Sequence, residues 1–333
     1  MTVPSPITGP SIPPTIPPII PPRIARGQIL GVVAPSGPVA PHKLDLLRRG
    51  LACLSEVFTL RVADSVTTPR PPANASYLAA SDEVRAAELT AMLADPDVRA
   101  IILARGGYGA MRILRALDPA LLARDPKPIV GFSDATALLA WAHHAGVRGI
   151  HGPLVIQLAD LAPADIAHLV TVLTEPRALG ELPWSLRSHD RGRGTVRGTL
   201  VPANLSMVSL LVGTPWQLPL AGAIALIEEV GERPYEIDRY ISQLTLTGAL
   251  AGTVGAVIGD LVRCSDPAPP SGGPDPADAA LDTLIAGLAA AGVPAVDGAP
   301  VGHGTRNAAI PFGAACELDL DHGRLAILDS AVA

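Results

Sequence analysis

Aromatic residues, cysteine and charge are all scarce in this chain of 333 residues. Aromatic side chains make up 3% of it and charged side chains 17%, and three cysteines are present, Cys53, Cys264 and Cys316. Because these cysteines are odd in number and far apart, they lack the close spacing of a zinc knuckle or a redox motif. We therefore expect three reduced thiols and a cytoplasmic location, where disulfides are rare.

An excess of positive charge and long apolar runs are missing as well. The formal net charge is −6, which argues against nucleic-acid binding because such proteins normally carry a basic stripe. No stretch of about 18 uncharged apolar residues occurs, so we expect no transmembrane helix and no membrane partner. The HExxH motif and His/Cys/Asp clusters with ligand spacing are also absent, so the sequence predicts neither a metal nor another cofactor.

Apolar residues are abundant, at 48% of the chain. A chain of this length exceeds what one hydrophobic core usually organises, so two domains are expected. Residues 1–26 form a proline-rich segment in front of them. Since prolines remove amide donors and fix φ, we expect this segment to be a flexible, extended tail.

Strand-like and helix-like patterns alternate through residues 27–160. The predicted strands lie at 29–34, 58–62, 99–104 and 128–130, and the predicted helices at 43–55, 81–94 and 135–144, with a further helix ending at Leu117. This alternation indicates βαβ units and a mostly parallel sheet covered on both faces. Three glycine-bearing turns follow strands, at 35–38, 105–109 and 131–134. The carboxyl ends of parallel strands share one edge, where ligands gather, so we expect these turns to meet there.

The pattern changes after about residue 160, where prolines punctuate a stretch that we interpret as the connection, residues 161–190. A second domain is expected over 191–333. Its predicted strands lie at 195–201, 224–229 and 254–262, its helices at 235–246 and 277–291, and a hairpin at 315–328 turns at 321–323.

One turn carries a candidate nucleophile. Gly131-Phe132-Ser133-Asp134 lies between a predicted strand and a predicted helix, where a tight turn holds a serine hydroxyl exposed at a helix N-terminus, as in many hydrolases. The amide of Asp134 and the Gly106-Gly107 turn are then candidate donors to an oxyanion. A serine in this position is also a common helix N-cap. A histidine able to act as its general base would favour the nucleophile over the cap.

Two histidines remain as candidate bases, His151 and His303, because the other six lie in an adjacent helical pair or in polar and terminal settings. His303 lies in a glycine-flanked loop, which suits an imidazole that approaches a serine. The carboxylate partner is expected at the end of a predicted strand, as Glu228 or Glu229. Because successive strand residues point to opposite faces, only one can face the cleft, and periodicity leaves the choice open.

Together these segments resemble the LD-carboxypeptidase family, a group of serine peptidases that includes the microcin C immunity peptidases. The resemblance covers about residues 28–330. The matching motifs are Ala34-Pro35-Ser36-Gly37, Arg105-Gly106-Gly107-Tyr108-Gly109, Gly131-Phe132-Ser133-Asp134-Ala135-Thr136, His151-Gly152-Pro153, Asn204-Leu205-Ser206, Gly213-Thr214-Pro215-Trp216, Glu228-Glu229-Val230-Gly231-Glu232-Arg233-Pro234-Tyr235 with Asp238-Arg239, and Gly302-His303-Gly304.

The resemblance implies a fold and a catalytic machinery. The implied fold is α/β, with a Rossmann-like N-terminal domain over 27–160 that carries the nucleophile and a C-terminal domain over 191–333 that contains a β-barrel. The active site would lie at the domain interface of a homodimer. The implied roles are Ser133 as nucleophile, Glu228 as the acid of the triad, His303 as general base, and the amides of Gly106, Gly107 and Asp134 as the oxyanion hole.

The resemblance also implies a substrate, a murein tetrapeptide that loses its terminal D-alanine across an L–D amide bond during peptidoglycan recycling. A substrate carboxylate calls for an arginine, and the residues expected to contact substrate are Arg105, Tyr108, Asn204 and Arg239, with Arg306 as a further candidate arginine. One departure is Pro202-Ala203, where family members commonly have Gly-Gly, which puts a contact by that turn in question.

The sequence is also compatible with two other functions. A microcin-immunity-type peptidase would cleave an aminoacyl-nucleotide conjugate and would require an aromatic platform for the base, for which Trp184 is the candidate. The second is a non-catalytic peptide-binding protein on the same fold, which the intact Ser133, Glu228 and His303 argue against.

Overall fold

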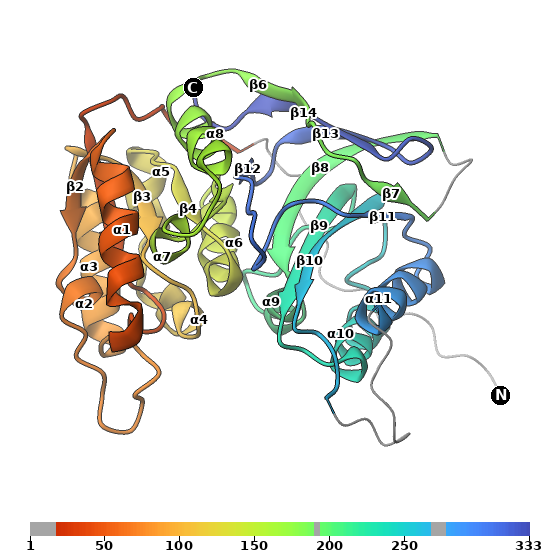
Figure 1. Ribbon diagram of the computed structural model, residues 1–333, viewed down its shortest axis with the longest axis horizontal. Helices are drawn as coiled ribbons and strands as arrows, with labels where there is room; N and C mark the ends of the chain where they lie inside the picture. Colours follow the sequence, from red (N-terminus) through yellow and green to blue (C-terminus); the bar gives the residue numbers. More distant parts are fainter. Residues whose placement is uncertain (1–17, 190–193, 268–277) are drawn as a thin grey trace.

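Two β-sheets, each flanked by helices, organise the computed structural model (Figure 1), which describes residues 18–189, 194–267 and 278–333. The first sheet has the strand order β12-β5-β4-β3-β1-β2, and the second the order β6-β14-β13-β8-β9-β10-β11-β7. The predicted α/β class is confirmed, with a mostly parallel first sheet and a second sheet that curls into a half-barrel.

The first sheet is built from short buried strands. They are β1 (Ile29–Val33), β2 (Thr59–Val62), β3 (Val98–Leu103), β4 (Ile129–Gly131) and β5 (Ile150–His151), all parallel, with β12 (Ile310–Pro311) antiparallel at the edge. In β3 only Arg99 is not buried, because a strand covered on both faces has no solvent side. The alternating pattern of the first half therefore predicted the right architecture.

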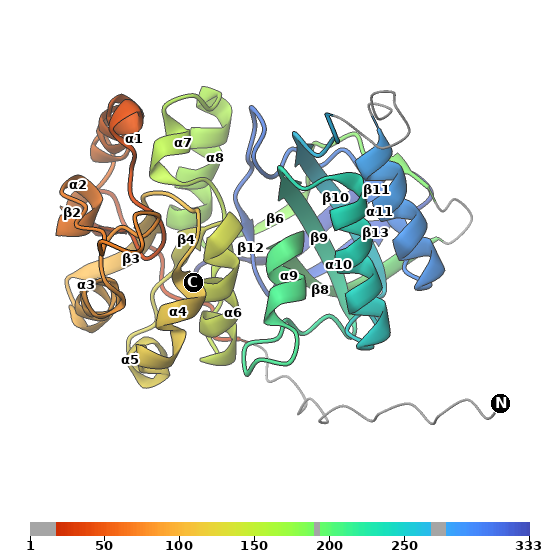
Figure 2. The same cartoon turned by 90° about the horizontal axis from the view of Figure 1, so that it is seen from below.

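Helices cover both faces of this sheet (Figure 2). On one face lie α1 (Leu44–Ser55), α7 (Val155–Leu158) and α8 (Pro163–Thr174), and on the other α3 (Asp82–Ala94), α4 (Ala110–Ile113), α5 (Pro119–Arg124) and α6 (Thr136–His144). The same half of the chain contains a one-turn α-helix, α2 (Asp64–Thr67), and the 3₁₀ helices η1 (Pro41–Lys43), η2 (Leu114–Ala116) and η3 (Ser133–Ala135).

The second sheet combines parallel and antiparallel strands. Its parallel part is β8 (Thr195–Asn204), β9 (Ala223–Val230), β10 (Gly255–Val262) and β11 (Ala295–Asp297), and its antiparallel part is β6 (Ala178–Glu181), β7 (Arg187–Ser188), β13 (Ala315–Asp319) and β14 (Arg324–Ser330). Three helices accompany it, α9 (Leu205–Leu211), α10 (Pro234–Leu246) and α11 (Ala279–Ala290). A separate apolar cluster that includes Leu200, Leu226 and Leu318 fills its curl.

The stretch 161–190, interpreted from sequence as a connection, contains regular structure. Pro163 is the first residue of α8 rather than a break, since proline at the first helical position loses no intrahelical hydrogen bond. Farther on, β6 pairs with β14 and β7 pairs with β11. Half of this stretch thus packs on the first domain and half extends the second sheet.

The chain crosses between the domains more than once. Strand β12 joins the first sheet from the second half of the chain, and the C-terminal Val332 is buried in the apolar cluster that includes Leu30 and Ile101 of that sheet. Residues 18–26, assigned from sequence to the flexible tail, are packed: Ile24 is fully buried and Ile19 bridges to Val147. Residues 1–17 of that tail lie outside the described residues. Among the helices of the described residues, none has the length and apolar character needed to cross a membrane.

Candidate functional site

The three predicted glycine turns meet at one edge of the first sheet. They follow β1, β3 and β4, which are neighbouring parallel strands. Ser133 comes two residues after β4 and adopts φ +62°. Only one other non-glycine residue in the described part of the chain has a positive φ, Arg263. Such backbone costs about 1–3 kcal/mol and persists where the surroundings enforce it, often at functional sites.

The turn after β3 lies directly against this serine. A Cβ atom placed on Gly106 would be 3.2 Å from the Cβ and 3.3 Å from the Oγ of Ser133. The next residue, Gly107, has φ +106°, which L side chains rarely adopt. Glycine at these two positions therefore lets the backbone amides of the turn come close to the hydroxyl, as an oxyanion hole requires.

The carboxylate of Asp134 ties the three turns together. It is buried, and Oδ2 accepts hydrogen bonds from Ser36 Oγ at 2.5 Å and from the Ala110 amide at 2.8 Å. Burial raises the pKa of Asp134, against the effect of these donors. Sequence reasoning gave Asp134 a role through its amide only and missed this side-chain role. In the sequence, Asp134 is only a carboxylate directly after the candidate serine. Its side-chain role could not be inferred without knowing that Ser36 and Ala110 lie next to it.

Two arginines donate hydrogen bonds to the turns at this edge of the sheet. The buried guanidinium of Arg85 donates to the carbonyls of Pro35 and Gly109, the second at 3.0 Å. Arg105, predicted to contact substrate, donates from Nη1 to the Pro38 carbonyl at 2.7 Å. Both groups satisfy turn carbonyls, so they stiffen the edge on which Ser133 lies.

The candidate base comes from the second domain. His303 Nδ1 lies 2.6 Å from Oε2 of Glu228, a fully buried residue of β9. The neighbouring Glu229 points the other way and accepts from Asn204 Nδ2 at 2.9 Å and from the Ser206 amide at 2.7 Å. Burial raises the pKa of Glu229. Strand periodicity left the choice between the two glutamates open. In the structure, Glu228 lies on the face of β9 that meets the loop of His303, and Glu229 lies on the opposite face.

A second carboxylate holds the loop of His303. Asp260, on β10, accepts from the Gly304 amide at 3.0 Å. Burial raises its pKa, and the nearby Glu228 acts in the same direction. Gly302 has φ +133°, and a Cβ there would lie 3.0 Å from Glu228 Cβ and 3.1 Å from Asp260 Cβ. The glycines flanking His303 therefore allow the loop to lie between two carboxylates, and Asp260 was not foreseen.

Contacts across the domain interface fix the position of this loop. Gln157 Nε2, from α7, donates to the Gly302 carbonyl at 3.0 Å, while Asn307 Oδ1 accepts from the Gly302 amide at 3.1 Å. Asn307 Nδ2 in turn donates to Gln157 Oε1 at 3.0 Å. The ring of His303 lies 4.6 Å, centroid to centroid, from that of Phe132, the residue before Ser133. The fold thus brings the candidate base beside the turn of the candidate nucleophile.

His151, the other candidate base, is buried beneath this arrangement. His151 belongs to β5, and the centroid of its ring lies 5.7 Å from that of Phe132. Burial, with the proximity of His303, lowers its pKa to about 3. A buried, neutral imidazole at this depth suits packing rather than proton transfer with a substrate.

The remaining predicted substrate contacts have different settings. Asn204 is buried and caps α9, accepting from the Met207 amide at 3.2 Å. Arg239 is exposed on α10, 5.4 Å from the centre of the Tyr235 ring, and Arg306 is paired with Asp165 at 2.7 Å. Tyr108 is half-exposed, directly after the Gly106-Gly107 turn.

Pro202-Ala203 and Trp184 also have structural settings. Both Pro202 and Ala203 are buried in β8, paired with β9, so this stretch is strand rather than an open turn. Trp184, the candidate platform for a nucleobase, packs partly buried against the apolar cluster of the second sheet.

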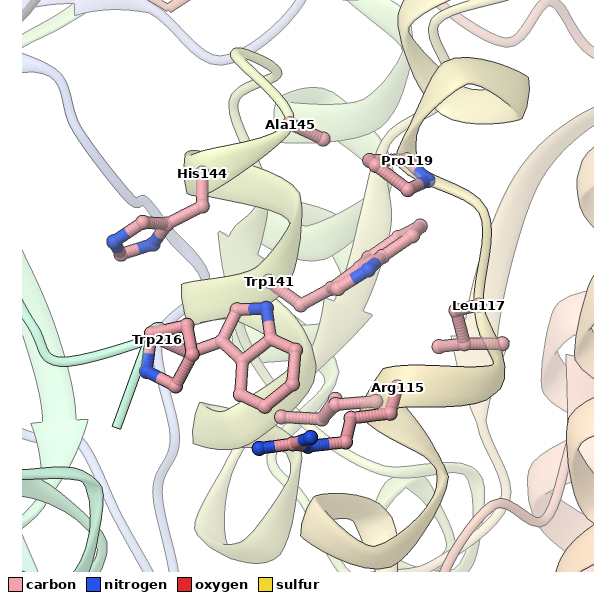
Figure 3. A pocket seen from close by; sticks show the side chains of 9 residues that line it. Arg115, Leu117, Pro119, Trp141, His144, Ala145 and Trp216 are labelled. Atoms are coloured by element: carbon pink, nitrogen blue, oxygen red, sulfur yellow. The ribbon is translucent and has the colours of Figure 1, made fainter.

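A cavity of about 520 Å³ lies elsewhere on the molecule (Figure 3). Trp141 and His144 of α6 line it together with Trp216, from the segment after α9. Because Ser133 precedes the N-terminal end of α6, this cavity is at the opposite end of that helix. It does not belong to the site around Ser133.

The chain is similar to known proteins along most of its length. Models of the LD-carboxypeptidase N-terminal and C-terminal domains match residues 30–152 and 197–318. A carboxypeptidase homologue of Streptomyces coelicolor is 36% identical over 313 residues, covering 92% of this chain and 94% of the homologue. The murein tetrapeptide carboxypeptidase of Pseudomonas aeruginosa is 32% identical over 301 residues, covering 87% and 92%. The solved structure of the immunity protein MccF with glutamyl sulfamoyl guanosine shares the fold, with a TM-score of 0.81 at 21% identity, covering 95% and 100%.

Proposed function

Because this chain belongs to the LD-carboxypeptidase family and is a serine-type peptidase, we propose that it releases the terminal D-alanine of murein tetrapeptides by hydrolysing an L–D amide bond. Ser133, His303 and Glu228 act as its catalytic triad. The observation that carries the proposal is the buried Glu228–His303 pair, at 2.6 Å, beside a serine held at φ +62°. The name of the Pseudomonas aeruginosa relative supports the choice of substrate.

The proposed mechanism is acyl transfer in two steps. His303 Nε2 takes the proton of the Ser133 hydroxyl while Oγ attacks the carbonyl carbon of the L–D bond. The oxygen of the tetrahedral intermediate accepts hydrogen bonds from backbone amides, of which those of Gly106, Gly107 and Asp134 are the candidates. The imidazolium then gives its proton to the leaving amine, and D-alanine departs with an acyl-enzyme left on Ser133. Water, deprotonated by His303, hydrolyses this ester and regenerates the serine.

Glu228 has two tasks in this scheme. By accepting from Nδ1–H of His303 it selects the tautomer in which Nε2 is free to act as a base. Its charge also stabilises the imidazolium that forms in each step. Because the residue is fully buried, this attraction is screened by solvent much less than at a surface.

We also propose that the enzyme acts in the cytoplasm on peptides recovered from peptidoglycan, as a homodimer. All three cysteines are free thiols, as expected in a reducing compartment. Sedimentation of the purified protein tests the dimer, since a monomer at micromolar concentration contradicts it. Fractionation of cells tests the location.

The function is tested by following D-alanine release from a murein tetrapeptide with wild type and Ser133→Ala. The variant is expected to lose most of the rate and to keep only the contribution of the oxyanion hole and of binding. Ser55→Ala is the matched control, because Ser55 is exposed at the end of α1. Full activity of Ser133→Ala, or no release by wild type, contradicts the proposal. Faster hydrolysis of an aminoacyl sulfamoyl adenosine than of the tetrapeptide favours the immunity-type substrate instead.

A further inference from the structure

Two exposed tyrosines lie beside the candidate active site without a role in the proposed chemistry. Tyr77 is 52% and Tyr108 is 48% exposed, and their rings meet edge to face with centroids 5.7 Å apart. Tyr235 of α10 is exposed as well, but it lies against Arg233 and Arg239. Tyr77 and Tyr108 instead pack on each other. An exposed aromatic pair beside a site offers an apolar face to a ligand.

Strand order locates this pair relative to Ser133. Tyr108 belongs to the turn after β3, and the Tyr77 loop rests on the turn after β1: Ala79 donates to the Ser36 carbonyl at 3.0 Å. Because the sheet runs β4-β3-β1, the pair lies along the edge on one side of β4. His303 approaches Ser133 from the second domain, which joins the sheet through β5 and β12 on the other side.

The two loops are built to hold the tyrosines. A Cβ on Gly109 would be 2.7 Å from Leu78 Cδ2, so glycine there lets the two loops pack together. The hydroxyl of Tyr108 interacts with Arg112, whose guanidinium is fixed by Asp82 through bonds of 2.7–3.0 Å. The rings are thus presented to solvent by a rigid support, which lowers the entropy cost of binding.

The direction of the reaction says which part of a substrate reaches this pair. A carboxypeptidase releases one terminal residue, so everything beyond that residue lies on the acyl side. Neighbouring strands are about 4.8 Å apart, which puts the turn of β1 roughly 10 Å from that of β4. An extended peptide spans about 3.3–3.6 Å per residue, so the three residues of the acyl part also span roughly 10 Å. The amino end of the peptide, where murein carries its sugar, therefore falls at the tyrosines.

We propose that Tyr77 and Tyr108 form a subsite for the pyranose ring of the muramic-acid-type sugar attached to the acyl end of the substrate. The C–H bonds on one face of such a ring carry partial positive charge, which the negative face of an aromatic ring attracts. The phenol hydroxyls offer hydrogen bonds to the sugar hydroxyls and acetamido group. This inference rests on the proposed function, since it assigns the distal end of the same substrate.

The experiment compares a free murein tetrapeptide with the same tetrapeptide carrying N-acetylmuramic acid. For each protein, the ratio of kcat/KM for the sugar-bearing over the free peptide is measured from D-alanine release. In Tyr77→Ala this ratio should fall about tenfold, as expected from the loss of roughly 1.4 kcal/mol of aromatic contact. Tyr108→Phe, which keeps the ring, should fall by less. Tyr235→Ala, an exposed tyrosine on α10, is the control and should keep the wild-type ratio.

A binding measurement separates recognition from catalysis. Calorimetry of the sugar-bearing tetrapeptide with Ser133→Ala should show tighter binding than with Ser133→Ala carrying Tyr77→Ala. Release of D-alanine from both substrates with an unchanged ratio in Tyr77→Ala overturns the subsite and leaves the proposed function intact. Release from neither substrate by the wild-type enzyme overturns the proposed function itself, and the subsite with it.

Discussion

The turn of Ser133 and the loop of His303 are positioned in different ways. Ser133 is held by groups of its own domain: a left-handed φ, a glycine turn packed against its side chain, and the neighbouring carboxylate of Asp134, which accepts hydrogen bonds from the other two turns. His303 is held by side chains that come from several elements, including Glu228 of β9, Asp260 of β10 and Gln157 of α7. The nucleophile is thus defined within one domain, and the base only once both domains are in contact.

This difference predicts different failures. Changes in the turn of Ser133 should disturb the first domain together with activity, because its contacts link three strands. Changes around His303 should alter activity while leaving each domain folded.

Glu228→Gln should have the largest effect. The substitution keeps the shape but removes the charge, and its amide can donate to Nδ1 and so favour the wrong tautomer. We expect kcat to fall about 10³- to 10⁴-fold, as for a triad carboxylate. Glu229→Gln is the control at the neighbouring position, and we expect it to lower stability more than kcat, because Glu229 supports Asn204 and Ser206. Equal kcat for Glu228→Gln and wild type would remove Glu228 from the triad.

Asp134→Ala tests the other region. The Ser36 hydroxyl and the Ala110 amide lose their acceptor, so we expect the free energy of unfolding to fall by about 1–3 kcal/mol. Displacement of the serine should lower kcat about 10²-fold. Chemical denaturation and D-alanine release measure the two effects. Asp118→Ala removes a carboxylate that also accepts from a backbone amide, at the start of α5, and should leave kcat unchanged. A similar loss of kcat in both variants would contradict the proposed coupling.

Asp260→Ala should have a smaller effect than Asp134→Ala. The Gly304 amide loses its acceptor, so the loop of His303 is held less firmly and kcat/KM should fall, by less than the roughly 10²-fold expected when a reacting group is misplaced. Asp260→Asn keeps an oxygen that can accept from the Gly304 amide and should retain most of the activity. D-alanine release measures both variants, and an equal loss in the two would contradict a role for Asp260 through this hydrogen bond.

His151→Gln should have the smallest effect on activity and a clear effect on acid stability. The pKa of His151 is about 3 in the folded protein, below its ordinary 6.5, so the unfolded chain binds more protons between these values. Stability therefore falls as pH drops through this window, by up to roughly 1.4 kcal/mol per pH unit. Glutamine cannot titrate, so the slope from pH 6.5 towards 3 should be shallower by that amount. His42→Gln, at an exposed residue, serves as control, and an identical slope in His151→Gln and wild type rules out this account.

Much of the first domain was predictable from sequence because its signals are local. Apolar runs such as Val98–Leu103 and helix starts such as Ser81, whose side chain accepts from the Val84 amide, depend on neighbouring residues. The stretch 161–190 was misread because α8, β6 and β7 are stabilised by distant partners, among them β14 and β11. Pairing between residues more than 100 positions apart leaves little trace in a short window.

For the site, the sequence by itself determined the residue types and their local settings: a serine after a short strand, glycines where close approach requires them, and a histidine between two glycines. The tertiary structure alone decided which glutamate of β9 faces His303, and that Asp260 and Gln157 hold the loop. The physical reason is that backbone conformation follows from adjacent residues, whereas a hydrogen bond between side chains follows from the packing of whole sheets and domains. That packing brought Phe132 and His303 within 4.6 Å across 171 positions of chain.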